Sequence, residues 1–504
     1  MFFKRKKKEN KESSNTPEYI DLPEDLKLTS KNLKEIFKDN EDVVFREIKI
    51  NSIEVTLFFI DGLISSVETS NFVLKPLKQA EVFKLAKNEK DIIEYIEEGS
   101  IYYVNQKTRD NISDVITDVL IGCTVLIFDH EKKAITFHNY GFDRRSVSEP
   151  SGENVIKGAK DSFVETFRVN TATIRRKIKS PELKIEQVIV GKRTHTPVDI
   201  IYMNHITNDK IIDQLKKRLE NIDVDGVLTT SFISEYIIDS KYTVFPQVIY
   251  TERSDKFCSD IIEGRVGIII DGIPTSLIIP ATFLQCLQAP EDYSKNYIIS
   301  SIIRLMRFVL FFTTLLLPSF YTAVVTFHQE MIPSKLAIFL ATAKEGVPFP
   351  SFLEVIFMLI AFEILLEAGI RLPRAIGQAV SIVGAIVVGQ AAVEANLVSP
   401  AVVVIVALTA ISSFAMPNQD LSNAVRLWRF VFVILASIIG LFGMVMGFLL
   451  LLLVLAKIEV LSVPYLSPFV ASEYQDMDDT IFRLPLSQQK SRPYNLKTED
   501  QQRR

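Results

Sequence analysis

The sequence predicts an α/β module of two similar subdomains, followed by a polytopic α-helical membrane module. Three observations lead to this fold class. The chain has 504 residues, which is more than one domain usually holds. Charged residues are concentrated before residue 300 and after residue 455, and the region between them is largely apolar. In the charged first part, short apolar runs alternate with stretches of helical spacing.

The first 25 residues are polar and contain a lysine-rich cluster. Because this stretch has no periodic apolar pattern, we predict a disordered basic tail at residues 1–25. No apolar segment follows the basic start, so the pattern is not that of a secretory signal peptide. We therefore expect the N-terminal module to be cytoplasmic.

Residues 26–150 and 151–300 are predicted to form the two α/β subdomains. The boundary lies in a segment rich in turn-forming residues, at 149–159. An apolar strand begins at Val55 and another at Val198, and each leads into a helical pattern. This internal similarity is the reason for expecting two similar halves.

The N-terminal module shows no motif of an enzyme or a metal site. It lacks a phosphate-binding loop, a GxGxxG motif after a strand and a GxSxG motif, and its histidines are scattered. Cys123, Cys258 and Cys286 have no metal-ligand spacing, so we interpret them as small buried residues. We predict no catalytic residue, no metal and no cofactor. The net charge of −4 argues against a nucleic-acid-binding protein.

The apolar region 301–456 is predicted to hold four or five membrane spans, followed by a polar, extended C-terminal tail at 457–504. Arg304 and Arg307 are expected to flank the first span on the cytoplasmic side. The candidate spans are residues 308–327, 351–370, 375–396, 400–416 and 430–456.

Five crossings from a cytoplasmic N-terminus would leave the tail outside. Basic residues in the tail, and Arg426 and Arg429 in the preceding loop, favour the inside. We therefore expect that one of the five segments does not span, and the suspects are 351–370 and 400–416.

The segment from Arg371 to Pro400 is the most unusual part of the apolar region. Small residues recur in it every four positions, which lets a neighbouring helix approach closely. Its glutamines and Glu394 are costly in lipid unless they face protein or water. Our hypothesis is a helix that lines and gates a water-filled path. The alternative is a tightly packed span whose polar groups lie near the headgroups. The proposed pore and gating residues are Gly377, Gln378, Ser381, Gly384, Val387, Val388, Gln390 and Glu394.

Segment 351–370 carries Glu354, Glu363 and Glu367 in an otherwise apolar sequence. Glu363 and Glu367 are four residues apart, so they share one helix face. Intramembrane carboxylates commonly mark a path for ions or protons. Two alternatives stay open: the helix lies in the interface, or the carboxylates pair with the arginines at 371 and 374.

Residues 352–414, from FLEV to AISSF, carry a distinctive pattern, and GRVGIIIDGIPTSLIIPATF and QAPEDY precede it. With these motifs the chain resembles the A subunit of GerA-type spore germinant receptors, from about residue 26 to residue 469. The positions that match the family's motif are Glu363, Glu367, Arg371, Pro373, Gly377, Gln378, Gly389, Gln390 and Glu394.

This resemblance implies a multi-pass protein in the inner membrane of a bacterial spore, with its N-terminal domain in the cytoplasm. It implies that the chain works with a transporter-like B subunit and a lipoprotein C subunit. It also implies self-oligomerisation into a ring whose helices conduct monovalent cations when a nutrient is bound. No catalytic residue or cofactor follows from it. A non-conducting signal-relay scaffold and a secondary transporter component remain as alternatives.

Overall fold

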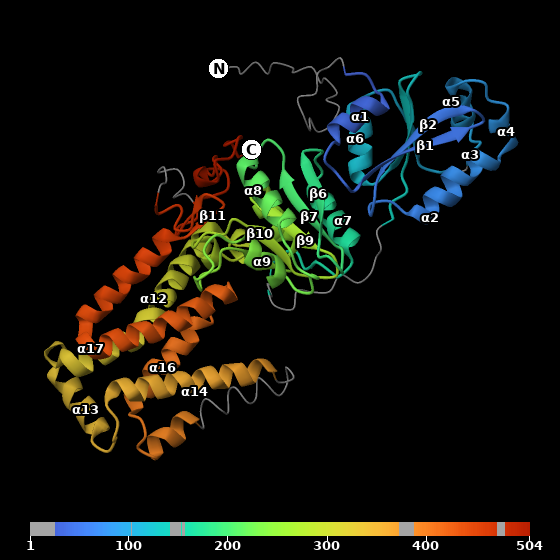
Figure 1. Ribbon diagram of the computed structural model, residues 1–504. Helices are drawn as coiled ribbons and strands as arrows, with labels where there is room; N and C mark the ends of the chain where they lie inside the picture. Colours follow the sequence, from blue (N-terminus) through green and yellow to red (C-terminus); the bar gives the residue numbers. More distant parts are fainter. Residues whose placement is uncertain are drawn as a thin grey trace, which may run out of the picture.

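The computed structural model describes residues 26–101, 103–141, 153, 157–371, 388–470 and 479–503. Two α/β subdomains are followed by a helical module (Figure 1). The last described residues return to the second subdomain, where the backbone N–H of Glu499 donates to the carbonyl oxygen of Ile206 at 3.2 Å.

The first subdomain is an antiparallel sheet in the order β1-β2-β4-β5-β3. Alternate residues of β4 enter two separate apolar clusters, so helices cover both faces of the sheet. The strands are β1 (Val43–Ile50), β2 (Ile53–Ile60), β3 (Gln106–Arg109), β4 (Thr124–Phe128) and β5 (Lys133–Phe137). The α-helices are α1 (Ser30–Ile36), α2 (Ser66–Glu68), α3 (Lys75–Gln79), α4 (Glu81–Lys84), α5 (Glu89–Glu97) and α6 (Ile112–Ile121).

The second subdomain repeats this topology in the order β6-β7-β9-β10-β8. Its strands are β6 (Leu183–Val190), β7 (Thr196–Met203), β8 (Ile249–Thr251), β9 (Val266–Ile270) and β10 (Ser276–Ile279). Its helices are α7 (Phe167–Lys177), α8 (Asp209–Glu220), α9 (Ser231–Ile237) and α10 (Ser254–Ile262).

The register of the strand pairs is repeated as well. Val125 pairs with Thr136 in the first sheet, and Gly267 pairs with Ile278 in the second, so each partner lies 142 positions after its counterpart. The expectation of two similar halves is confirmed. The strands that suggested it, at Val55 and Val198, are the equivalent strands β2 and β7.

A buried ion pair joins the two subdomains. The Nε and Nη2 atoms of Arg175 donate to the two carboxylate oxygens of Asp42, both at 2.8 Å, and neither residue is exposed. Asn40 accepts a further hydrogen bond from Nη2 at 2.6 Å. Because a bidentate pair fixes orientation as well as distance, the subdomains are held in one arrangement at this point.

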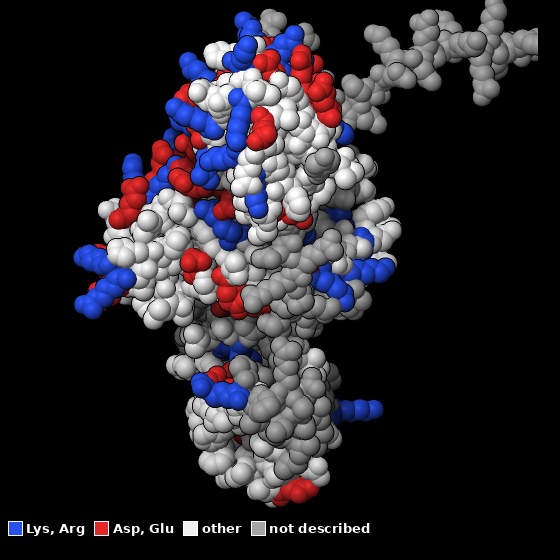
Figure 2. Space-filling view, turned by 90° about the vertical axis from the view of Figure 1, so that its right-hand side faces the viewer, with Lys and Arg blue, Asp and Glu red and all other residues white. Residues whose placement is uncertain are grey.

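The helical module consists of α11 (Glu291–Ser294), α12 (Tyr297–Phe327), α13 (Ser334–Lys344), α14 (Ser351–Arg371), α16 (Pro400–Ser413) and α17 (Gln419–Lys457). In the described part of the chain, α12 and α17 are the helices long and apolar enough to cross a membrane. Charged side chains gather over the α/β subdomains, and few appear on the lower, helical part (Figure 2).

Helix α17 turns back on itself at Gly440. This residue has φ 63° and ψ −140°, a conformation that is essentially reserved for glycine. A Cβ atom on Gly443 would lie 2.1 Å from the carbonyl oxygen of Leu435, so the chain after the turn runs against the chain before it. The expected span 430–456 is therefore divided between two antiparallel arms, 419–439 and 441–457, which meet at an acute angle (Figure 1).

The GxxxG pattern of Gly443 and Gly447 packs this hairpin together. A Cβ on Gly447 would lie 3.2 Å from side-chain atoms of Leu435 and Phe432 in the first arm. At 1.5 Å per residue the arms are about 30 Å and about 25 Å long, so each approaches the thickness of a bilayer core.

The described part of the C-terminal tail differs from the extended chain that we expected. It forms β11 (Glu459–Val460), β12 (Val463–Pro464) and a 3₁₀ turn at Tyr494–Leu496. Tyr465 is fully buried, and a Cβ on Gly264 of the second subdomain would lie 2.5 Å from Thr498. Apolar side chains of the tail enter the core of that subdomain. The same core continues into the adjoining end of the helical module.

We expect Gly440→Ala to lower the free energy of unfolding by at least about 2 kcal/mol. Alanine is strained in this conformation, and its Cβ would lie 2.9 Å from Nε2 of His328. Unfolding of the full-length chain in detergent measures the effect. Gly346→Ala is the control, because its Cβ meets Asn396 at an ordinary 3.4 Å. Equal stability of the two variants would show that the turn is not fixed by glycine.

Asp199, in the interior strand β7, predicts a pH-dependent stability. Burial raises the pKa of this carboxyl from 3.8 to about 7, against a smaller opposing effect of Arg168. Because the folded state holds the proton more tightly, stability is lost as pH rises from about 4 through 7.

We expect Asp199→Asn to raise the free energy of unfolding by up to about 4 kcal/mol at pH 8, and by less than half of that at pH 5. Unfolding of the full-length chain at the two pH values measures the gain. Asp225→Asn, at a carboxylate whose side chain is 80% exposed, serves as the control. A gain that is the same at both pH values would contradict the assignment.

Candidate functional site

Glu363 of α14 faces two arginines of α17. Its Oε1 accepts from Nη2 of Arg429 at 2.7 Å, and its Oε2 accepts from Nη1 of Arg426 at 3.1 Å. Arg429 is completely buried, and its Nε and Nη1 atoms have no hydrogen-bond partner among the described residues. One carboxylate thus holds two guanidinium groups, and the cluster ties α14 to the first arm of α17.

Glu363 and Glu367 have separate arginine partners. Glu363 pairs across to α17, where Arg426 and Arg429 lie inside the helix instead of in a polar loop. Glu367 pairs with Arg371 one turn further along the same helix, and both side chains are mostly exposed. The two carboxylates therefore do not act as one pair, although they are four residues apart.

Glu354 anchors the other end of α14. It is fully buried, and its Oε2 accepts from the backbone N–H of Ser399 at 2.8 Å. Ser399 is the N-cap residue of α16, where a negative charge is stabilised by the helix dipole. The ammonium group of Lys344 lies 3.5 Å from the other carboxylate oxygen. Between Glu354 and Glu363 the packing is apolar, through Val355 and Leu359.

Three of the proposed pore and gating residues can be placed. Val388 borders an apolar cavity of about 390 Å³ between α14 and α16. The side chains of Gln390 and Glu394 are exposed, and Nε2 of Gln390 donates to Oε1 of Glu394 at 2.9 Å. The remaining five lie outside the described residues, and they are Gly377, Gln378, Ser381, Gly384 and Val387.

Gly389 shows the close helix approach that the small residues predict. It is buried, and a Cβ at this position would lie 3.2 Å from Cγ1 of Val403 in α16. The next residues of the segment, Gln390 and Glu394, turn their polar groups away from this contact. At 388–394 the packed face and the polar face of the segment are thus different faces.

A second charged cluster fastens α12 to the second subdomain and the tail. Asp292 accepts from Arg304 at 3.1 Å and from Arg307 at 3.0 Å, and all three are buried. Arg304 also donates to Asp479 of the tail at 2.6 Å. Burial alone would raise the pKa of Asp292, but the hydrogen bonds and charges of Arg307 and Arg304 hold that pKa below its ordinary value. Arg304 and Arg307 therefore lie within α12, and their ion pairs hold the start of this helix against the residues that precede it.

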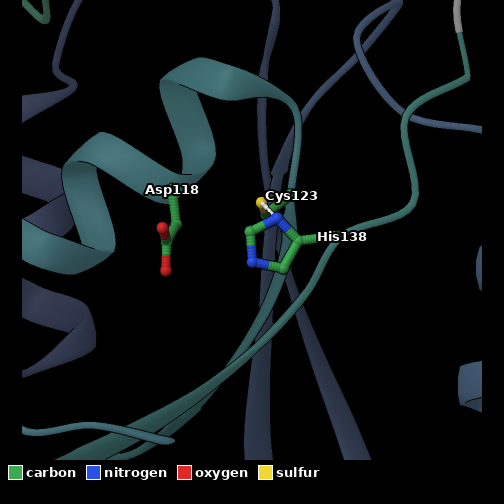
Figure 3. A group of neighbouring side chains, drawn as sticks. All are labelled: Asp118, Cys123 and His138. Carbon is green, nitrogen blue, oxygen red and sulfur yellow. Dashed lines mark hydrogen bonds between the residues drawn. The ribbon is translucent and has the colours of Figure 1, made fainter. Parts of the chain in front are cut away.

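The fold also brings together Asp118, Cys123 and His138, which the sequence spacing did not reveal (Figure 3). They come from α6, from the residue before β4 and from the residue after β5. The Sγ atom of Cys123 lies 3.3 Å from Nδ1 of His138. Burial raises the pKa of the Cys123 thiol to about 12 and lowers the pKa of His138, so both groups are neutral at pH 7.

These residue types can hold a metal ion, but the contacts favour a structural role. Both carboxylate oxygens of Asp118 are already engaged by Arg109, at 2.9 and 3.1 Å, and Thr136 donates to one of them at 2.9 Å. The equivalent residue of the second subdomain, Asp260, is likewise held by an arginine, Arg265, at 3.4 Å. Each subdomain thus pairs this acid with an arginine, although Arg109 lies in β3 and Arg265 directly precedes β9.

The sequence model of the Bacillus/Clostridium GerA spore germination protein family matches residues 31–495. This chain belongs to the GerA family. It is 38% identical to Spore germination protein KA of Bacillus subtilis (strain 168), over 94% of this chain and 88% of that protein. It is 33% identical to Spore germination protein GerLA of Bacillus cereus, over 95% of this chain and 97% of that protein.

Two further comparisons extend the list of similar proteins. The Uncharacterized membrane protein YfkQ of Bacillus subtilis (strain 168) is 37% identical, over 91% of this chain and 89% of that protein. A crystal structure of the N-terminal domain of the A subunit of the Bacillus megaterium spore germinant receptor GerK3 is 30% identical, with a TM-score of 0.41, over 51% of this chain and 94% of that chain. The resemblance drawn from the sequence motifs is confirmed at the level of the family.

In this GerA-family chain we expect Glu363→Leu to lower the free energy of unfolding by about 3 kcal/mol or more, because it leaves two arginines unpaired. The double variant Glu363→Leu/Arg429→Met should be less destabilised than the sum of its single variants, because it also removes the buried charge. Unfolding of the full-length protein in detergent completes the cycle.

Glu367→Gln is the matched control for this cycle. It breaks an exposed pair on the same helix, and should cost less than about 1 kcal/mol. Strictly additive effects of Glu363→Leu and Arg429→Met would contradict the coupling of α14 to α17 through this ion pair.

Proposed function

We propose that this chain is the A subunit of a nutrient-responsive spore germination receptor in the inner spore membrane. In this proposal it oligomerises and forms a gated ion-conducting path together with B and C subunits. Membership of the GerA family supports the receptor role, since the relatives KA and GerLA are spore germination proteins.

The outer surface of the helical module supports its insertion in a membrane. Large apolar side chains are exposed along both long helices, for example Val309, Ile438, Phe442 and Leu453. An apolar surface of this extent is unfavourable in water and indicates a lipid or protein environment.

The course of the chain through the helical module supports an even number of crossings. Helix α14 starts beside Ser399, the first turn of α16, and reaches Arg429 of α17 through Glu363. After Arg371 the description resumes at Val388, and Gly389 lies beside Val403 near the start of α16 again. Gly389 and the first turn of α14 therefore lie near the same end of α16.

In the proposal α12, α14, the segment 375–396 predicted from the sequence, α16 and the two arms of α17 make six crossings. An even number returns the tail to the side of the α/β subdomains, where its described residues are packed. The mismatch between five crossings and a cytoplasmic tail disappears because Gly440 divides the last segment into two.

The exposed pair of Gln390 and Glu394 carries the conducting part of the proposal. In the single chain both side chains are exposed, on a short helix whose Gly389 packs on Val403 of α16. At membrane depth such groups are costly unless another protein surface or enclosed water satisfies them. Copies of the chain arranged in a ring would supply both, with these residues along the enclosed path.

We expect Val388→Ala to increase ion flux without nutrient by about tenfold. Valine at the edge of the cavity fills space in the closed arrangement, and a loss of about 1.4 kcal/mol from that arrangement shifts a two-state equilibrium tenfold. Potassium and sodium flux through vesicles containing the chain with its B and C subunits measures the effect. Val404→Ala is the control, an exposed valine of α16 outside this cavity.

The same measurement separates the proposed channel from its alternatives. Vesicles with Val388→Ala that are as tight as those with Val404→Ala, together with wild-type vesicles that carry no current on nutrient addition, would favour a non-conducting scaffold. Slow, saturable flux would instead favour a transporter component.

A further inference from the structure

The second subdomain exposes a group of large apolar side chains close to the helical module. We call the group the aromatic edge, and it consists of Leu228, Phe232, Tyr236, Tyr242 and Val244. Phe232 and Tyr236 are four residues apart on α9, so they share a face of that helix. Tyr242 is completely exposed and Leu228 is 73% exposed. Five such residues within one short segment are more than the scattered apolar residues of an ordinary soluble surface.

The aromatic edge is held at a defined level along α17. The ring of Phe245, next to Val244, lies 6.2 Å from the ring of Trp428 in the first arm. Val244 also lines a shared cavity with Leu427 of α17. Figure 1 shows α9 at the end of the second subdomain that faces the start of α17.

The outward face of α17 becomes apolar at this same level. Leu427, Val431, Ile434 and Ile438 are exposed and follow one another at helical spacing. If the helical module lies in a bilayer, this strip faces lipid, and its first residue is beside Val244. The aromatic edge therefore continues the strip onto the second subdomain.

The chemistry of the edge fits the boundary between headgroups and acyl chains. Tyrosine is enriched there because its ring is apolar and its hydroxyl remains hydrated. The exposed Lys241 stands next to Tyr242 and suits an anionic headgroup. Of the nearby acids, Asp239 is paired with Arg218, while Glu235 is exposed.

We propose that the aromatic edge is inserted in the headgroup region of the bilayer and holds the second subdomain against the membrane surface. The inference rests on the proposed function only in that the helical module must span the bilayer. The second subdomain then contacts the membrane directly. Its orientation relative to the bilayer is fixed at two places, the aromatic edge and the ion pairs of α12.

Single-tryptophan probes in the full-length protein test this inference. Trp428 is the one tryptophan of the chain, so Trp428→Phe provides a background without signal. Tyr242→Trp is placed in that background and reconstituted in phosphatidylcholine–phosphatidylglycerol vesicles. We expect loss of its fluorescence when the acyl chains are brominated near the headgroup end, and little quenching by aqueous acrylamide.

Two control probes, one expected in water and one expected in lipid, are needed to interpret the quenching of Tyr242→Trp. Val104→Trp stands at an equally exposed position of the first subdomain and should be quenched by acrylamide but not by the brominated lipid. Ile438→Trp stands on the outward face of α17 and reports whether the helix is in lipid at all. Tyr236→Trp repeats the test at a second edge position if Tyr242→Trp fails to fold, as judged by gel filtration.

The outcomes are distinct. Quenching of Ile438→Trp by brominated lipid, with Tyr242→Trp behaving like Val104→Trp, would overturn the inference and leave the membrane helices in place. Shielding of Tyr242→Trp from acrylamide without lipid quenching would show that protein covers the edge, and would also overturn it. No lipid quenching of Ile438→Trp would overturn the proposed membrane insertion itself.

Discussion

The helical module depends on the backbone conformation of Gly440. A residue at φ 63° and ψ −140° cannot continue an α-helix, and a side chain there would collide with the end of α12. Because the two arms of α17 are antiparallel, the chain after the turn returns to the level at which α17 began. The tail can then reach Tyr293 and Arg304 near the start of α12, where Asp479 accepts hydrogen bonds from both.

Buried charges set how the other helices meet this hairpin. Glu354 fixes the start of α14 to α16, and Glu363 fixes its second half to α17. Replacing buried ion pairs by apolar residues is often neutral or stabilising, so their presence is a weak argument for stability. Their geometry is more informative, because each pair permits one register of α14 against its neighbours. The apolar contacts around Leu359, between the two carboxylates, would tolerate sliding.

Local patterns in the sequence were sufficient for the first part of the fold. Apolar runs starting at Val55 and Val198 gave the equivalent strands, since a short apolar run bounded by turn residues is visible within a few positions. The buried pair of Arg175 and Asp42 was not predictable, because its partners are 133 residues apart. The cluster around Cys123 was missed for a similar reason, since its members come from three elements joined by sheet pairing.

The helical module shows where such patterns stop being informative. Gly440 stands in a long apolar run with no proline or polar neighbour, so the segment has the appearance of one continuous span. The sequence marks Glu363 as an unusual carboxylate, but its partners are 63 and 66 residues further on, in the first arm of α17. Composition identifies a costly charge, and only the fold identifies the residue that compensates for it.

The proposed gating requires one part of the molecule to move, and the distribution of ion pairs and buried contacts indicates which part is least firmly held. The second subdomain, the first turns of α12, the tail and the near end of α17 share one apolar core and the ion pairs of Asp292, so they act as one body. The far part of the module is joined to α16 through Glu354, which accepts from Ser399, and through the apolar contacts of Val355 and Leu359. Lys344 of α13 lies beside the same carboxylate. A rearrangement that is biased by a partner subunit would break fewest interactions there. Gln390 and Glu394 follow directly after Gly389, which packs on α16, so such a movement would carry their exposed polar groups with it.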